Sequence, residues 1–115
     1  MANFEVVRED KGEISVLNVH GYLDAHTAPD FENALTKLLQ ENRFKIVVNL
    51  NGLQYISSAG LGVFMGFIEE VRENSGDIKL AEVSQKVFKV FDLLGFPSLY
   101  EFYEKASEAI VKFTN

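Results

Sequence analysis

Short apolar runs separated by polar turns fill the first half of the chain and predict strands that alternate with helices. Residues 4–8 and 13–20 are rich in Val, Ile and Leu and flank the turn-forming sequence EDKG, so they are predicted to pair as a β-hairpin. The β-branched run at residues 45–50 predicts a buried central strand, and residues 78–83 form a further run of this kind. The sequence LYEFY (residues 99–103) is predicted to add a short edge strand.

Apolar residues that recur at intervals of three and four predict helices between and after these strands. The first helix begins after Thr27, a candidate N-cap, and the second runs from about residue 59 to residue 73. A third follows a candidate cap at Ser84, and the last spans residues 107–113. The predicted buried faces are Phe31, Leu35, Leu38 and Leu39 for the first helix, Leu61, Phe64, Met65, Ile68 and Val71 for the second, Val87, Phe91 and Leu94 for the third, and Ala109, Ile110 and Phe113 for the last.

Strands that alternate with helices after an opening hairpin predict an α/β fold. The expected architecture is a mixed β-sheet of four to five strands with about four helices packed on it. At 115 residues the chain is predicted to form a single domain over residues 1–115. Its hydrophobic fraction of 47% is sufficient for a substantial core.

The charge and composition of the chain exclude several classes of protein. Seventeen acidic residues against eleven basic ones give a net charge of −6, which argues against direct binding to nucleic acid. The absence of cysteine excludes disulfides and thiolate metal sites. The N-terminal sequence is not that of a signal peptide, and no apolar run is long enough to span a membrane, so we expect a cytoplasmic protein without a membrane partner.

The sequence YISSAGLGVF (residues 55–64) contains glycines that resemble a dinucleotide-binding motif. Gly60, Gly62 and Gly66 are spaced G-x-G-x-x-x-G, which is one residue too long at the third glycine. The motif also opens directly after a strand, whereas seven residues separate Leu50, the predicted strand end, from Ser58. We therefore interpret Gly62 and Gly66 as a smooth stripe on a helix that lets a neighbouring element approach closely.

The same stretch lacks the partners that a catalytic serine needs. The sequence SAG matches half of a nucleophile elbow, but Ile56 stands where the first glycine is required. His20 is expected to be partly buried because it is in register with apolar positions of its strand, and His26 is a loop residue. These two histidines and Asp24 match no known metal-ligand spacing. We therefore expect no catalytic residue, no metal and no cofactor, and a protein that is not an enzyme.

A phosphorylation site fits the double serine better. Ser57 or Ser58 is expected at the N-cap of the second helix, where free amide groups and the helix dipole favour a phosphate. Gly60 and Gly62 leave room for another protein to come close. A serine cap followed by a packed helix, with no modification, explains the same residues and remains open at this point.

The first turns of this helix are apolar on almost every side. Leu61 and Phe64 lie on the predicted buried face, whereas Val63 and Phe67 fall outside it. Either another element covers both sides of the helix, or Val63 and Phe67 form an exposed apolar patch beside the serines. Exposed patches of this kind usually mark surfaces that bind a partner.

Three segments of the chain resemble the STAS-domain family, and specifically the bacterial anti-sigma-factor antagonists. They are GYLDAHTAP after the second predicted strand, KIVVNLNGLQYISSAGLGVF in the middle, and FKVFDLLGFPSLYEFYEKASEAI near the end. The segments occur in family order over nearly the whole chain, and the central one is the most specific.

The resemblance implies that the chain acts in a partner switch. In this family the unphosphorylated antagonist binds an anti-sigma factor that is a GHKL-type serine kinase, and the sigma factor is released. The kinase then phosphorylates a serine, which corresponds to Ser58 here, and a PP2C-type phosphatase resets the switch. The motif continues through Gly60, Leu61 and Gly62, and Asp24 matches an aspartate in a loop beside the acceptor. The resemblance also implies weak nucleotide binding near this site.

One position departs from the family pattern. Many antagonists have an aspartate immediately before the acceptor, where this chain has Ser57, so Ser57 is the alternative phosphorylation site. The partner-binding surface is expected to include Asp24, Ser57, Gly60, Leu61, Gly62, Val63 and Phe67. The alternative hypothesis is a STAS scaffold that is not phosphorylated and serves another complex, in stress signalling or lipid transport.

Overall fold

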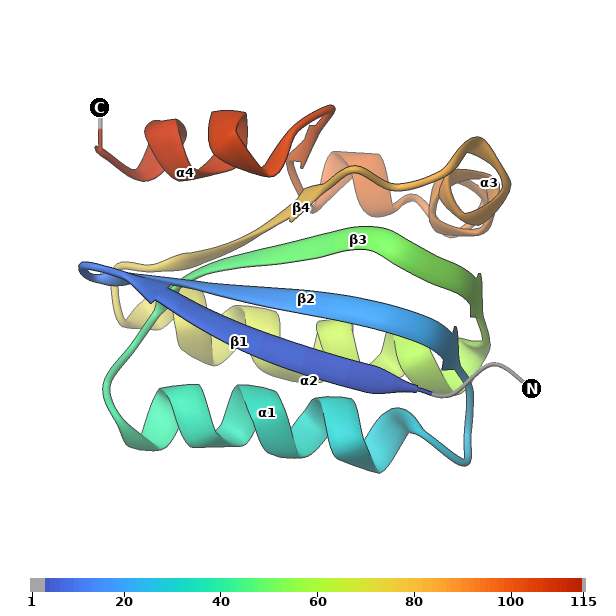
Figure 1. The fold of residues 1–115 in the computed structure, drawn as a ribbon, viewed down its shortest axis with the longest axis horizontal. Helices are drawn as coiled ribbons and strands as arrows, with labels where there is room; N and C mark the ends of the chain where they lie inside the picture. Colours follow the sequence, from blue (N-terminus) through green and yellow to red (C-terminus); the bar gives the residue numbers. More distant parts are fainter. Residues whose placement is uncertain (1–3, 115) are drawn as a thin grey trace.

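The computed structural model describes residues 4–114 and contains one mixed sheet with helices on both faces (Figure 1). Its strands lie in the order β1-β2-β3-β4-β5; β1 and β2 are antiparallel, and the other neighbouring pairs are parallel. The predicted hairpin and the predicted mixed α/β sheet are confirmed. The strands are β1 (Glu5–Lys11), β2 (Ile14–Leu23), β3 (Lys45–Ile56), β4 (Asp77–Ala81) and β5 (Phe102–Tyr103).

The helices divide between the two faces of the sheet. α1 and α2 lie on one side and α4 lies on the other (Figure 1). The main core joins α1, α2 and α3 to the sheet, through Phe31, Leu35 and Leu38 of α1, Leu61, Phe64, Ile68 and Val71 of α2, and Val87 and Phe91 of α3. A smaller core packs Ala109 of α4 on Ile14, Val16, Val47 and Ala81. The helices are α1 (Ala28–Gln40), α2 (Ser58–Glu73), α3 (Gln85–Leu93) and α4 (Ala106–Thr114), with a 3₁₀ turn η1 (Phe96–Ser98).

The central strand β3 is longer than predicted. It continues past Leu50 to Ile56, so only Ser57 separates β3 from α2 and the predicted seven-residue gap does not exist. Asn51 and Gly52 in this part disfavour a strand by themselves, yet β3 stays paired with β2 to its end, with two irregularities in register. The distance from the strand therefore no longer excludes a dinucleotide motif, whereas the spacing of Gly60, Gly62 and Gly66 still does.

His20 is exposed, and its predicted partial burial is wrong. It lies on the face of the sheet that carries α4, but α4 packs nearer the start of β2, on Ile14 and Val16. The His20 ring instead lies over Gly52, where an added Cβ atom would come within 1.9 Å of His20 Nδ1. His26 is an exposed loop residue, as predicted.

Two residues of the predicted buried faces are exposed, and three are only half-buried. Met65 is 46% exposed, because the buried face of α2 is centred on Leu61, Phe64 and Ile68. Leu94 is exposed because α3 ends at Leu93 and the backbone leaves the helix at Leu94. Leu39, Ile110 and Phe113 are half-buried and pack against the margins of the two cores.

A buried lysine connects β4 to the residues around α4. Lys79 Nζ lies 2.6 Å from Glu101 Oε1 and 3.2 Å from Asp77 Oδ2. The same ammonium lies 4.7 Å from the centre of the Phe113 ring, which is a cation–π distance. These contacts hold the end of α4 against the sheet.

Glu101 is expected to make a small contribution to stability that disappears in acid. The hydrogen bonds from Lys79 and then from Tyr103 hold the pKa of Glu101 below its ordinary value. A lowered carboxyl pKa stabilises the fold above the unfolded-state pKa, and this stabilisation is lost as the pH falls through the folded-state value. Because Glu101 is exposed, Glu101→Gln should cost no more than about 1 kcal/mol at neutral pH.

Urea unfolding of the wild type and of Glu101→Gln between about pH 7 and pH 3 measures this contribution. The difference in unfolding free energy should shrink toward zero at the acidic end. A difference that is constant with pH would contradict the assignment.

Candidate functional site

The ends of β2 and β3 bring the predicted site residues together. These strands are parallel neighbours, so the loop before α1 and the start of α2 lie at the same edge of the sheet, on the right of Figure 1. The backbone N–H of Ser57 donates to the Leu23 carbonyl at 2.9 Å. Asp24 follows Leu23 directly, so this hydrogen bond joins the Asp24 loop to the double serine.

The two serines have different positions at the start of α2. Ser57 is the N-cap, half-buried, and its Oγ accepts a hydrogen bond from the Gly60 N–H at the long distance of 3.5 Å. Ser58 is the first residue of the helix and is exposed. The first turn of α2 contains no acidic residue, so no carboxylate of its own offsets the positive end of the helix dipole.

The Asp24 loop is ordered by hydrogen bonds to its own carboxylate. Asp24 Oδ1 accepts from the backbone N–H of Thr27 at 3.1 Å and from that of His26 at 2.9 Å. These bonds, with that from Thr27 the largest, hold the pKa of the Asp24 carboxyl below its ordinary value, so the side chain is ionised at neutral pH.

Thr27 stands at the predicted N-cap position of α1, but its side chain makes no capping hydrogen bond. Its hydroxyl donates to the Tyr22 carbonyl at 2.7 Å and accepts from the Asp24 N–H at 3.0 Å. The threonine therefore closes the loop instead of capping the helix, and it fixes the direction in which Asp24 leaves β2.

The glycines of α2 serve different purposes. An added Cβ atom at the buried Gly60 would lie 2.7 Å from Leu23 Cγ, so this glycine lets the first turn of α2 approach the end of β2. Gly62 and Gly66 have no atom within 4 Å of an added Cβ. The prediction that another part of the chain packs closely on them is therefore wrong within residues 4–114, and both glycines face solvent.

The apolar residues beside the serines are mostly covered. Leu61 is buried in the main core, and Val63 and Phe67 are half-buried against the same core. Phe67 also lines a shallow hollow together with Leu39 and Gln40 of α1. The sequence allowed either a helix covered on both sides or an exposed apolar patch of Val63 and Phe67, and the structure is closer to the covered helix.

An exposed pair of tyrosines beside the site was missed in the sequence. Tyr22 and Tyr55 lie opposite each other on β2 and β3, with ring centres 5.9 Å apart. Tyr22 precedes Leu23, and Tyr55 is two residues before Ser57. The alternation of side chains along a strand indicates both tyrosines once β3 is known to extend to Ile56.

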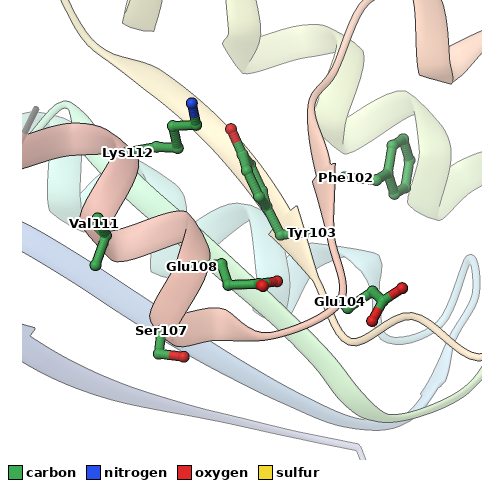
Figure 2. Close-up of a pocket in the computed structure, with 7 residues that line it drawn as sticks. All are labelled: Phe102, Tyr103, Glu104, Ser107, Glu108, Val111 and Lys112. Atoms are coloured by element: carbon green, nitrogen blue, oxygen red, sulfur yellow. The ribbon is translucent and has the colours of Figure 1, made fainter.

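A second hollow lies elsewhere in the molecule. β5 and α4 form it, and Figure 2 shows Tyr103, Glu108 and Lys112 along it, whereas the Phe102 ring points away. None of its lining residues belongs to the elements that carry Ser58 and Asp24.

Across residues 4–114, no group of three His, Cys, Asp or Glu side chains is placed to hold a metal ion. In the same part of the chain, no helix has the length and apolar character needed to cross a membrane.

Comparisons with known proteins agree with this geometry. A model of the STAS domain family matches residues 5–109. The chain is 32% identical over 97 residues to the anti-sigma-B factor antagonist of Staphylococcus aureus (strain NCTC 8325 / PS 47), which covers 84% of this chain and 88% of the relative. Two solved structures share the fold. An anti-sigma factor antagonist from Mycobacterium paratuberculosis has a TM-score of 0.86 at 20% identity and covers 98% of this chain and 96% of its own. The Bacillus cell fate determinant SpoIIAA in its phosphorylated form has a TM-score of 0.74 at 22% identity, and the match covers 96% of this chain and 99% of the SpoIIAA chain.

Proposed function

Because the chain belongs to the STAS domain family, we propose that it is an anti-sigma-factor antagonist that works by exchanging partners. Unphosphorylated, it binds an anti-sigma factor that is a GHKL-type serine kinase, and the sigma factor is released. Phosphorylation of Ser58 ends this binding, and a PP2C-type phosphatase restores it. The observation that carries the proposal is the exposed Ser58 at the first position of α2, next to Ser57, whose backbone bond to Leu23 joins this helix to the loop of the ionised Asp24.

The difference between the two serines supports Ser58 as the phosphate acceptor. Within residues 4–114 the Ser58 hydroxyl has no hydrogen-bond partner, whereas the Ser57 hydroxyl caps Gly60 and is half-buried. A kinase needs a hydroxyl that can enter its active site, and Ser58 meets this need without disturbing the cap. A phosphate at this position lies near the free N–H groups of the helix, which stabilise it. The fold should therefore survive phosphorylation.

The added charge accounts for the loss of the partner. A phosphoryl group brings about −1.5 to −2 charges to a surface that already carries the Asp24 carboxylate. In a docked complex this charge must be desolvated, and acidic groups of both proteins repel it. A loss of about 3 kcal/mol weakens binding roughly 100-fold. Such a change exchanges partners without any large rearrangement of the fold.

The residues expected at the partner surface divide into three groups. Ser58 and Gly62 are exposed, and we assign them, together with the half-buried Asp24, to contact with the partner. Gly60 and Leu61 are buried, so they shape the site from within. Ser57, Val63 and Phe67 are half-buried and stand at its margin. Tyr22 and Tyr55 extend the accessible surface along the ends of β2 and β3.

Gly62→Ala is expected to stabilise the protein and to weaken binding of the kinase partner. The added methyl group meets nothing in this chain, and replacing glycine inside a helix contributes about 0.5–1 kcal/mol. Gly62 lies one turn from Ser58, where the methyl group would separate the partner backbone from α2. Calorimetric titration with the kinase and thermal unfolding measure the two effects.

Gly66→Ala is the matched control for Gly62→Ala. It also has open space around the added methyl group, and it lies a further turn away from Ser58. It should give the same stabilisation with unchanged binding. Equal binding of the Gly62 variant and the wild type would contradict close approach of a partner at Gly62.

A reconstituted switch tests the proposed function. The purified protein is mixed with the kinase-type anti-sigma factor encoded in the same genome, which is already bound to its sigma factor. The unphosphorylated protein should displace the sigma factor, ATP should reverse this after phosphorylation, and a PP2C phosphatase should restore it. Binding that ignores ATP would favour an unphosphorylated scaffold. No binding at all would overturn the proposal.

A further inference from the structure

The outer side of α3 carries exposed leucines beside exposed lysines. Leu93 is 84% exposed and Leu94 is 59% exposed, and Lys86 and Lys89 are also exposed. Lys86, Lys89 and Leu93 follow at intervals of three and four, so they lie along one face of the helix. We call Lys86, Lys89, Leu93 and Leu94 the α3 ridge. Figure 1 places α3 at one corner of the molecule.

The stability of the fold does not explain these residues. Val87 and Phe91 hold α3 to the core from its opposite face. The leucines bury little surface in this chain, so they add little hydrophobic stabilisation. Lys86 stands in the first turn of α3, where a positive charge faces the positive end of the helix dipole, and that turn contains no acidic residue. Leu93 and Leu94 are adjacent and both exposed, and neighbouring apolar residues that together form an exposed patch are typical of a binding surface.

The charge of the ridge indicates what kind of partner it fits. The chain as a whole carries a net charge of −6, and several of its basic side chains are neutralised by ion pairs, among them Arg8, Arg72 and Lys79. In the described part of the chain, the ion pairs include neither Lys86 nor Lys89. Asp92, between Lys89 and Leu93, is the one acidic residue of α3 and is exposed, so the ridge is an apolar strip with a small excess of positive charge on an acidic protein. Its complement is an acidic surface with an apolar centre.

The ridge is continuous in structure with the Ser58 site. α3 packs against β3, the strand that ends at Ile56, directly before Ser57. Phe91 of α3 contacts Phe64 of α2 with ring centres 5.7 Å apart, so one core positions both helices. A partner that binds around Ser58 and is large enough to be a kinase can reach both surfaces at once.

We propose that the α3 ridge is a second contact for the anti-sigma kinase, and that it receives an acidic kinase surface with an apolar centre. The inference rests on the proposed function. The Ser58 site senses phosphorylation, while the ridge supplies affinity that does not depend on it. Phosphorylation of Ser58 should therefore weaken binding without removing the contribution of the ridge.

Two double variants test this contact in the full chain. The first is Leu93→Ser with Leu94→Ser, and the second is Lys86→Glu with Lys89→Glu. The control combines Val111→Ser with Lys105→Glu and Lys112→Glu, because Val111 is 51% exposed on α4, which packs on the other face of the sheet. Calorimetric titration with the kinase, at about 50 and 500 mM salt, gives the affinities, and thermal unfolding checks the fold.

The leucine variant should weaken kinase binding by about tenfold or more, with an unchanged unfolding midpoint. The lysine variant should weaken binding at low salt and lose much of the salt dependence that the wild type shows. The control should bind as the wild type does. Ridge variants that bind within about twofold of the wild type would overturn the ridge and leave the proposed function standing. A wild-type protein that does not bind the kinase would overturn both.

Discussion

Ser58→Asp is expected to weaken binding to the kinase-type anti-sigma factor by roughly 100-fold and to leave the protein folded. The carboxylate places a negative charge at the first residue of α2, where the helix dipole tolerates it in the free protein. In the complex the same charge is buried beside the Asp24 carboxylate and the partner's acidic groups. Calorimetric titration of the variant with the kinase, in the absence of ATP, measures the loss.

Ser57→Asp is the matched control for this substitution. It adds the same charge one residue earlier, at the N-cap, where aspartate is among the preferred residues. Its side chain should turn toward the Gly60 N–H, as that of Ser57 does, and away from the partner. We expect this variant to bind within a few-fold of the wild type. Equal losses from both substitutions would mean that the overall charge, and not the position of Ser58, controls binding.

Phe64→Ala is expected to cause the largest loss of stability, about 3–5 kcal/mol. Phe64 is fully buried, and its ring centre lies 5.0 Å from that of Phe31, 5.7 Å from Phe91 and 6.0 Å from Tyr100. The ring therefore joins α1, α3 and the segment after η1 to α2, and its removal leaves a cavity where these elements meet. Urea unfolding followed by circular dichroism measures the change in unfolding free energy.

Met65→Ala is the comparison for Phe64→Ala. It is the next residue on the same helix but is 46% exposed, so its loss should cost less than about 1 kcal/mol. Similar losses for the two variants would contradict the central position of Phe64 in the core. The same experiment tests the corrected buried face of α2, because the sequence pattern predicted Met65 on that face and the structure exposes it.

The arrangement of the core could be predicted from the sequence because its helices are strongly periodic. Phe31, Leu35 and Leu38 are buried as their spacing indicates. The end of β3 could not be predicted in this way. Asn51 and Gly52 disfavour a strand locally, and only pairing with β2 holds them in one. That pairing is a property of the whole sheet.

The site was predicted in outline and not in its detail. The resemblance placed Asp24 beside the serines, and the hydrogen bond from Ser57 to Leu23 shows how the two segments meet. Both serines suit an N-cap, so the sequence identifies the capping one only if the end of β3 is known. The pairing of Tyr22 with Tyr55 also requires β3 to reach that end. Because the strand was predicted too short, neither the capping serine nor the tyrosine pair was identified.

Locating the phosphate is the most direct measurement of the central claim. The wild type, Ser57→Ala and Ser58→Ala are each incubated with the kinase and ATP, and the modified residue is identified by mass spectrometry of peptides. Ser58 as the acceptor predicts a single phosphate on the wild type and on Ser57→Ala, located at Ser58, and none on Ser58→Ala. A phosphate on Ser57, or an unmodified wild-type protein in the presence of an active kinase that binds it, would contradict the account.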